Sequence, residues 1–178
     1  MTRWTPGERK PDPAAMLRVD QAGEYGATRI YAGQLTVLGR GTTASHLVAR
    51  MAAQEQQHLQ RFNALMTERK VRPTLLQPLW NIAGFALGAA TALMSEQAAM
   101  ACTEAVETEI DRHYADQLTQ LGDSDPEFSK DILGFQAEEL EHRETARAHG
   151  AADAVGYPLL TAAIRAGCRV AITLSTHI

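Results

Sequence analysis

Apolar residues recur along this chain at steps of three and four, the period of amphipathic helices, and no alternating pattern typical of strands is evident. The first helix is predicted from Pro13, which follows the capping residue Asp12, to about Leu38, where a glycine-rich turn stops it. A second helix is predicted to start after Thr42-Thr43 and to end near Arg69. The pattern therefore favours an all-α protein.

An uncharged apolar segment follows the second predicted helix. Residues 70–78 contain two prolines and are predicted to form a connector, and residues 79–94 are predicted to be an apolar helix that continues or resumes as far as Leu121. At 1.5 Å per residue the apolar helix is roughly 24 Å long, shorter than a ~30 Å hydrocarbon core. We therefore expect it to lie in the membrane interface without spanning it, with headgroup contacts from Arg69, Lys70 and Arg72 and additional contacts from Arg165 and Arg169.

Two further helices complete the predicted fold. One runs from about Pro126 to His149 and is ended by a glycine, and the last follows the turn at 156–158. Residues 1–12 are polar and contain prolines, so a mobile arm is predicted there, followed by a single domain over residues 13–178.

Four of these helices carry acidic or histidine side chains on faces that are otherwise apolar. In the second helix, for example, Glu55 and His58 share one face with Met51 and Phe62. A solvated charged face would lie opposite the apolar residues, whereas these side chains replace core residues. The six residues are Glu24, Glu55, His58, Glu107, Glu139 and His142.

These six residues form a repeat. Glu-x-x-His occurs at Glu55/His58 and at Glu139/His142, and a further glutamate lies about thirty residues before each copy. One glutamate from each of two helices and Glu-x-x-His from two others is the ligand set of ferritin-like di-iron bundles. Two divalent cations would balance the four buried carboxylates, and oxygen and imidazole ligands suit iron or manganese. We prefer this metal centre to the alternative, a hydrogen-bonded polar network in the core.

Other polar residues near these stripes are interpreted differently. Tyr114 lies seven residues after Glu107, so it could hydrogen-bond at the site or be a core tyrosine. Gly84 and Gly88 lie four apart on an apolar helix and are predicted to allow close approach of a helix or a ligand. Several acids fall off the stripes and are expected to be solvated or ion-paired: Glu104, Glu109, Glu138, Glu141 and Glu144.

Composition excludes some classes of protein. The net charge of −4 and the absence of a long basic stripe argue against nucleic acid as a partner. Cys102 and Cys168 form no C-x-x-C motif, and no secretory signal pattern opens the chain, so two reduced, buried thiols in a cytosolic compartment are expected.

One longer stretch of the chain is Arg18-Val19-Asp20-Gln21-Ala22-Gly23-Glu24-Tyr25-Gly26-Ala27. This stretch resembles the opening signature of a known family, the demethoxyubiquinone hydroxylases of ubiquinone biosynthesis. Members often have histidine where this chain has Gln21, but that position is not an expected ligand. The resemblance covers nearly the whole chain and includes residues 30–34, 72–74, 78–81, 84–88, 99–103, 138–142 and 166–172.

The resemblance implies a ferritin-like four-helix bundle with an additional membrane-associated apolar helix and a C-terminal helix. It implies a peripheral enzyme on the cytoplasmic face of the cell membrane that uses two irons and O₂ to hydroxylate the ring of a demethoxyubiquinone. Glu24 and His58 would bind one iron, Glu107 and His142 the other, and Glu55 and Glu139 would bridge them. Electrons would come from an external donor such as NADH or a reductase, and other ubiquinone-biosynthesis proteins would be partners.

Three other functions remain as alternatives. A ferritin-like iron oxidase or storage subunit would share the site, but the uncharged segment argues against a soluble cage. A non-enzymatic quinone-binding bundle would use the site only to hold its helices together. A quinol oxidase would reduce O₂ to water without hydroxylating its substrate.

Overall fold

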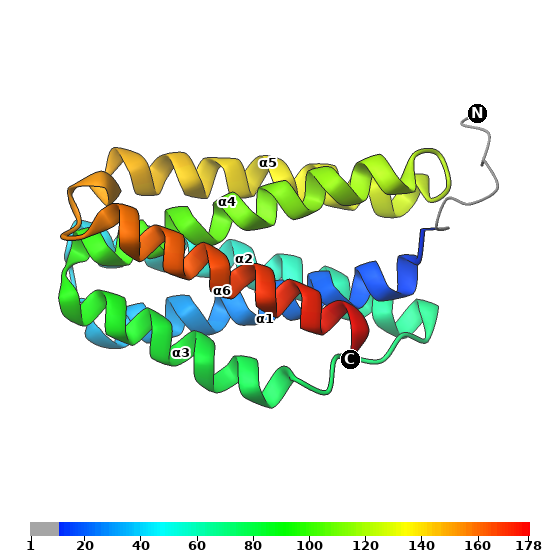
Figure 1. The fold of residues 1–178 in the computed structure, drawn as a ribbon, viewed down its shortest axis with the longest axis horizontal. Helices are drawn as coiled ribbons and strands as arrows, with labels where there is room; N and C mark the ends of the chain where they lie inside the picture. The colour runs from blue at the N-terminus through cyan, green and yellow to red at the C-terminus, as the bar shows by residue number, and fades with distance from the viewer. Residues whose placement is uncertain (1–10) are drawn as a thin grey trace.

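The computed structural model describes residues 11–178, and all regular structure within that range is helical (Figure 1). Most of the predicted arm at 1–12 lies outside the described residues. The elements are α1 (Pro13–Val37), α2 (Thr43–Arg69), α3 (Gln77–Met94), α4 (Glu96–Leu121), α5 (Pro126–Ala148), the short 3₁₀ helix η1 (Ala151–Asp153) and α6 (Tyr157–His177). The prediction of an all-α protein is confirmed.

Local capping explains where the helices begin. The Asp12 carboxylate accepts hydrogen bonds from the backbone N–H groups of Ala14 and Ala15, and Pro13 occupies the first helical position, as predicted. The sequence left open whether the apolar helix continues into the next one. Ser95 answers this, because its extended backbone ends α3 while its hydroxyl accepts from Ala98 N–H and caps α4.

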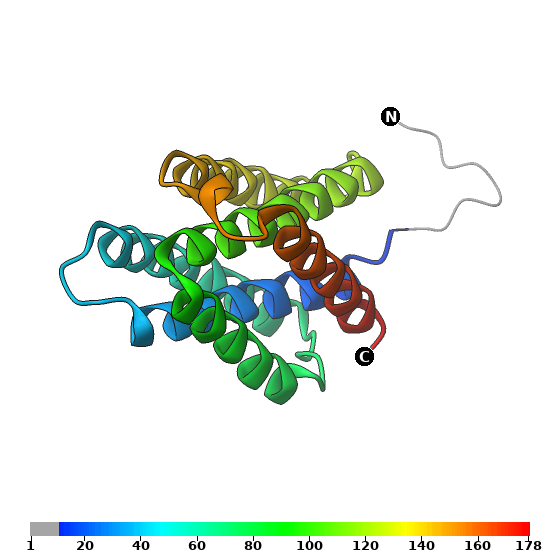
Figure 2. The ribbon, with the colours of Figure 1, turned by 60° about the vertical axis from the view of Figure 1, so that its left-hand side comes forward.

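The four long helices α1, α2, α4 and α5 form a bundle of two hairpins, α1/α2 and α4/α5, and the other two helices flank it (Figures 1 and 2). The first flanking helix, α3, packs mainly along α1, and the second, α6, packs mainly along α4. This is the predicted ferritin-like bundle with one additional apolar helix and a C-terminal helix.

Glycines bring α3 and α1 into backbone contact. A Cβ atom added at Gly88 would lie 1.9 Å from the Ile30 carbonyl oxygen, and one at Gly84 would lie 2.9 Å from the Gly26 carbonyl oxygen. From the other side, a Cβ at Gly33 would lie 2.2 Å from the Phe85 carbonyl oxygen. The predicted role of Gly84 and Gly88 in close helix approach is therefore confirmed.

The bundle interior has two main apolar clusters with a polar region between them. Along α2, Met51 belongs to the first cluster and Phe62 to the second, and Glu55 and His58 lie between these positions. Surface ion pairs also join α2 to α5, namely Arg61 with Asp131 and Arg69 with Asp125. The polar region is therefore enclosed at both ends by close-packed side chains.

The two flanking helices expose apolar side chains. On α3, Ile82 is 71% exposed and Leu93 is 73% exposed, and α6 exposes Leu159, Val170 and Leu174. Within residues 11–178, only Tyr157–His177 is long and apolar enough to cross a membrane, and this judgement rests on length and composition alone. Helix α3 does not meet this criterion of length and composition.

Candidate metal centre

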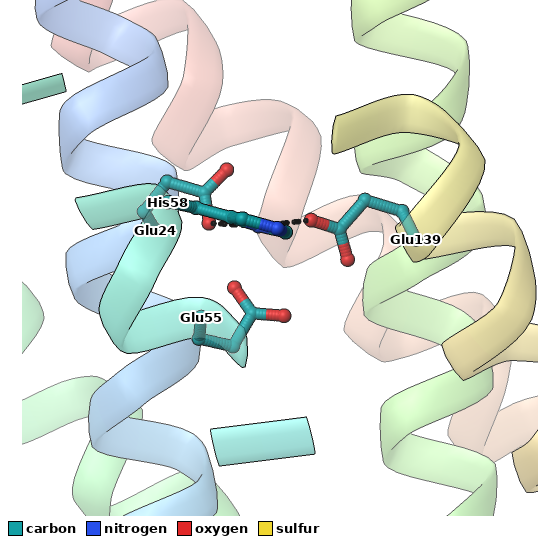
Figure 3. A group of neighbouring side chains, drawn as sticks. All are labelled: Glu24, Glu55, His58 and Glu139. Atoms are coloured by element: carbon teal, nitrogen blue, oxygen red, sulfur yellow. Dashed lines mark hydrogen bonds and ion pairs between the residues drawn. The ribbon is translucent and has the colours of Figure 1, made fainter. Parts of the chain in front are cut away.

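The six side chains predicted to bind metal converge in the middle of the bundle. Each is at most 2% exposed. They form two overlapping groups in which the potential ligand atoms all lie within 4.8 Å of one another. The first group holds Glu24, Glu55, His58 and Glu139 (Figure 3), and the second holds Glu55, Glu107, Glu139 and His142. Glu55 and Glu139 belong to both groups, which is the arrangement required of bridging ligands.

Both histidines present the same ring nitrogen to the carboxylates. His58 Nδ1 lies 3.1 Å from Glu139 Oε1 and 3.5 Å from Glu24 Oε2 (Figure 3). His142 Nδ1 lies 3.1 Å from Glu139 Oε2 and 3.1 Å from Glu55 Oε1. Nδ1 is therefore the nitrogen that each ring offers to a shared cation.

Two buried tyrosines hold the non-bridging carboxylates from across the bundle. Tyr114 of α4 donates to Glu24 of α1, and Tyr31 of α1 donates to Glu107 of α4 at 2.6 Å. Burial raises the pKa of both phenols well above the usual value, so both keep the protons that they donate. Tyr114 is thus both a core tyrosine and a hydrogen-bond donor at the site. Tyr31 was not identified as a site residue from the sequence, although Tyr31 lies seven residues after Glu24, as Tyr114 does after Glu107.

Burial, together with neighbouring carboxylates, controls the electrostatics of the site without bound cations. Burial, reinforced by the neighbouring carboxylates, raises the pKa of Glu55 and Glu107 well above the usual value. Burial raises the pKa of Glu139 to about 7 despite its hydrogen bond with His58. Burial opposes the charged form of His58, but hydrogen bonds to Glu139 and Glu24 raise its pKa to about 11. Without bound cations these three acids therefore favour the protonated, neutral form, and their ionised form needs compensation by positive charge.

Unpaired oxygen atoms indicate what would provide that compensation. Within residues 11–178, four buried carboxylate oxygens accept no hydrogen bond, namely Glu24 Oε2, Glu107 Oε2 and both oxygens of Glu55, although histidine nitrogens lie within 3.5 Å of two of them. Buried polar atoms normally have a partner, because leaving one unpaired costs about 1 to 3 kcal/mol. Two divalent cations would satisfy these atoms and balance four carboxylates, and a site of oxygen and imidazole donors without thiolate suits iron. The residues present therefore fit two iron ions.

The acids expected to be solvated or ion-paired divide into two kinds. Glu104 and Glu109 are ion-paired but buried, the first with Arg147 and the second with both Arg165 and Arg169. Glu138, whose side chain is 43% exposed, instead approaches His58 Nε2 at 3.1 Å. It is therefore part of the site's surroundings, a role that its position off the apolar stripe did not reveal.

An apolar cavity of about 520 Å³ lies between α1, α3, α4 and α6. Its floor includes Gly23 and Val106, which are chain neighbours of Glu24 and Glu107. Cys168 also lines it, while Cys102 is fully buried nearby; both are free thiols, and burial raises the pKa of each to about 12. The cavity can hold an apolar molecule beside the helices that carry Glu24 and Glu107.

Comparisons with known proteins agree with this geometry. The family model described as ubiquinone biosynthesis protein COQ7 matches residues 12–175. A "3-demethoxyubiquinol 3-hydroxylase" of Rhodospirillum rubrum is 52% identical over 177 residues, which cover 97% of this chain and 82% of the relative. A mitochondrial "NADPH-dependent 3-demethoxyubiquinone 3-hydroxylase" of Homo sapiens is 51% identical over 167 residues, 92% of this chain and 76% of the relative. The chain therefore belongs to the COQ7 family of ubiquinone biosynthesis proteins.

Proposed function

We propose that this protein is an O₂-dependent di-iron hydroxylase that adds a hydroxyl group to the ring of a demethoxyubiquinol during ubiquinone biosynthesis. The observation that carries the proposal is the buried cluster of four glutamates and two histidines, with two carboxylates shared between two ligand groups. The names of relatives at about half identity over most of the chain support the substrate class.

In this proposal Glu24 and His58 would hold one iron, Glu107 and His142 would hold the other, and Glu55 and Glu139 would be shared between them. The bound iron pair supplies the activation and reduction of O₂. The chain's own residues fix the ligands: Tyr31 and Tyr114 donate to the non-bridging carboxylates. The apolar clusters on both sides exclude bulk water, which strengthens these interactions.

The apolar cavity is proposed as the site of the quinone head group. Its lining is almost entirely apolar, and its floor adjoins the backbone next to two of the ligands, Glu24 and Glu107. At one end Trp80 Nε1 donates to Ser175 Oγ at 2.9 Å, which ties α3 to α6. A long apolar tail would leave between these two helices, whose outer faces are themselves apolar.

We further propose that the protein binds the cytoplasmic face of the cell membrane through α3 and the exposed side of α6. Exposed leucine, isoleucine and valine side chains on both helices support this. Arg69, Arg165 and Arg169 are engaged in ion pairs with acids of the bundle, so headgroup contact is assigned to the exposed Lys70 and Arg72. The electron donor is external, and the Homo sapiens relative's name points to a reduced nicotinamide.

The test is oxygen-isotope labelling. Metal-free protein is loaded anaerobically with about two equivalents of Fe²⁺ and mixed with reductant, ¹⁸O₂ and a short-tailed demethoxyubiquinol, and the products are weighed by mass spectrometry. The proposal predicts a product heavier by one labelled oxygen atom. Label found only in water would favour a quinol oxidase, and iron loading far beyond two ions per chain without product would favour the storage alternative.

A further inference from the structure

The candidate metal centre is built twice from the same parts. The terminal carboxylates Glu24 and Glu107 each accept from a tyrosine of the opposite hairpin, and each tyrosine lies seven residues after the other repeat's equivalent glutamate. The bridging pair Glu55 and Glu139 and the pair His58 and His142 are likewise chemically identical. At this level nothing distinguishes one metal position from the other.

The outer nitrogen of each histidine is also held across the bundle. His58 Nε2 lies 3.1 Å from Glu138 Oε2, and His142 Nε2 lies 3.1 Å from Gln54 Oε1. Gln54 Nε2 in turn donates to Glu138 Oε2 at 3.3 Å, which links the two contacts. Gln54 and Glu138 each directly precede a bridging glutamate, so they occupy the same position in the two repeats.

The chemistry at these two positions differs. When Nδ1 of each histidine binds a metal ion, the remaining ring proton lies on Nε2 and is donated outward. His58 donates it to a carboxylate, whereas His142 donates it to a neutral amide oxygen. An outer carboxylate makes a ligating imidazole more basic, and losing such a partner typically costs about 10- to 100-fold in metal affinity.

We propose that Gln54 and Glu138 are paired positioning residues that make the two metal positions unequal, with the position served by His58 binding its ion more tightly. This inference rests on the proposed di-iron function and adds an order to its two sites. Both residues fix the rings with Nδ1 inward, and the carboxylate of Glu138 strengthens one ring as a ligand. An ordered pair of sites lets the chain fill one position before the other.

The test is calorimetric titration of the full-length, metal-free protein with Co²⁺, an air-stable stand-in for Fe²⁺. We expect two separate binding steps. Glu138→Gln should weaken the tighter step by about tenfold and bring the two affinities together, because both histidines then donate to amides. Glu141→Gln is the matched control: it removes the same charge from an exposed position of the same helix and should leave both steps unchanged.

A double variant distinguishes the ring partner from general charge. Gln54→Glu combined with Glu138→Gln keeps the net charge and moves the carboxylate to His142, so the two steps should separate again. Restored separation supports the inference. Equal weakening of both steps in Glu138→Gln, or two unchanged steps, overturns it and leaves the proposed function standing. Failure of wild type to bind two ions overturns the metal centre itself.

Discussion

Tyr31 and Tyr114 each donate a hydrogen bond to a carboxylate of the opposite helical hairpin. Tyr31→Phe removes only the hydroxyl that donates to Glu107, so a buried acceptor loses its donor while the packing is kept. We expect the metal-free protein to lose about 1 to 3 kcal/mol of unfolding free energy, measured by urea denaturation. Metal affinity at the Glu107 position should also fall, by about 10-fold or more.

Tyr25→Phe provides the matched control for this change. Tyr25 is half-buried on the same helix and directly follows Glu24. The substitution removes a phenol of the same kind near the same site, and it should leave both stability and metal binding close to wild type. If the two variants behave alike, the hydroxyl of Tyr31 is not a support of the site.

The sequence predicts the proposed ligands of the site but not the residues that hydrogen-bond to them. The six proposed ligands could be predicted because each replaces an apolar residue within a helical stripe and the whole set repeats. Gln54, Glu138 and Tyr31 could not be assigned in the same way, because their partners lie on other helices and no local pattern reveals them. Only comparison of equivalent positions in the two repeats, a tyrosine seven residues after each glutamate, carried a usable signal.

At the scale of elements, the contact of α3 with α1 depends on glycine. Gly88→Ala would place a Cβ atom 1.9 Å from the Ile30 carbonyl oxygen, so one helix must shift. Overpacking of this kind typically costs about 1 to 3 kcal/mol, and here it would also displace the wall of the apolar cavity. We expect lower stability in urea denaturation together with a raised KM for the quinol.

Gly134→Ala is the control for the glycine change. Gly134 is exposed within α5, and a Cβ atom there would meet nothing within 4 Å. Replacing an unstrained helical glycine by alanine stabilises a protein by about 0.5 to 1 kcal/mol, because the unfolded chain loses freedom. The close packing of α3 on α1 would be contradicted if Gly88→Ala lowered the free energy of unfolding by no more than the size of the change that Gly134→Ala produces.

Helix boundaries were predictable because their signals are local. Three helices start directly after a residue whose side chain caps them, and the structure begins helices there. These capping residues are Asp12, Thr42 and Asp125, and a proline follows the first and the last. The boundary at Ser95 was left open, because apolar residues precede it and the residues after it continue the helical pattern with small side chains. The break between the two helices depends on packing, because α3 packs along α1 whereas α4 packs with α5.

For the whole molecule, the proposed membrane contact lies on the two flanking helices, α3 and α6. In Figure 1, α3 lies along the lower edge of the molecule, α6 crosses in front of the bundle, and α5 lies along the upper edge. The cavity lies among α1, α3, α4 and α6, so the proposed substrate with its long apolar tail would meet the protein near the exposed apolar residues of α3 and α6. Membrane binding and substrate entry would then use the same surface.

This arrangement predicts that charge on the outer face of α3 releases the protein from membranes. Ile82→Asp and Leu93→Asp replace side chains that are 71% and 73% exposed, so the fold and the iron content should stay close to wild type. Burying a carboxylate in the interface is unfavourable, and anionic lipid repels it, so sedimentation with vesicles containing phosphatidylglycerol should fall severalfold. Leu133→Asp, at a 56% exposed position on α5, adds the same charge away from this face and should leave vesicle binding unchanged. Equal loss of binding in all three variants would mean that net charge, and not the α3 face, controls the association.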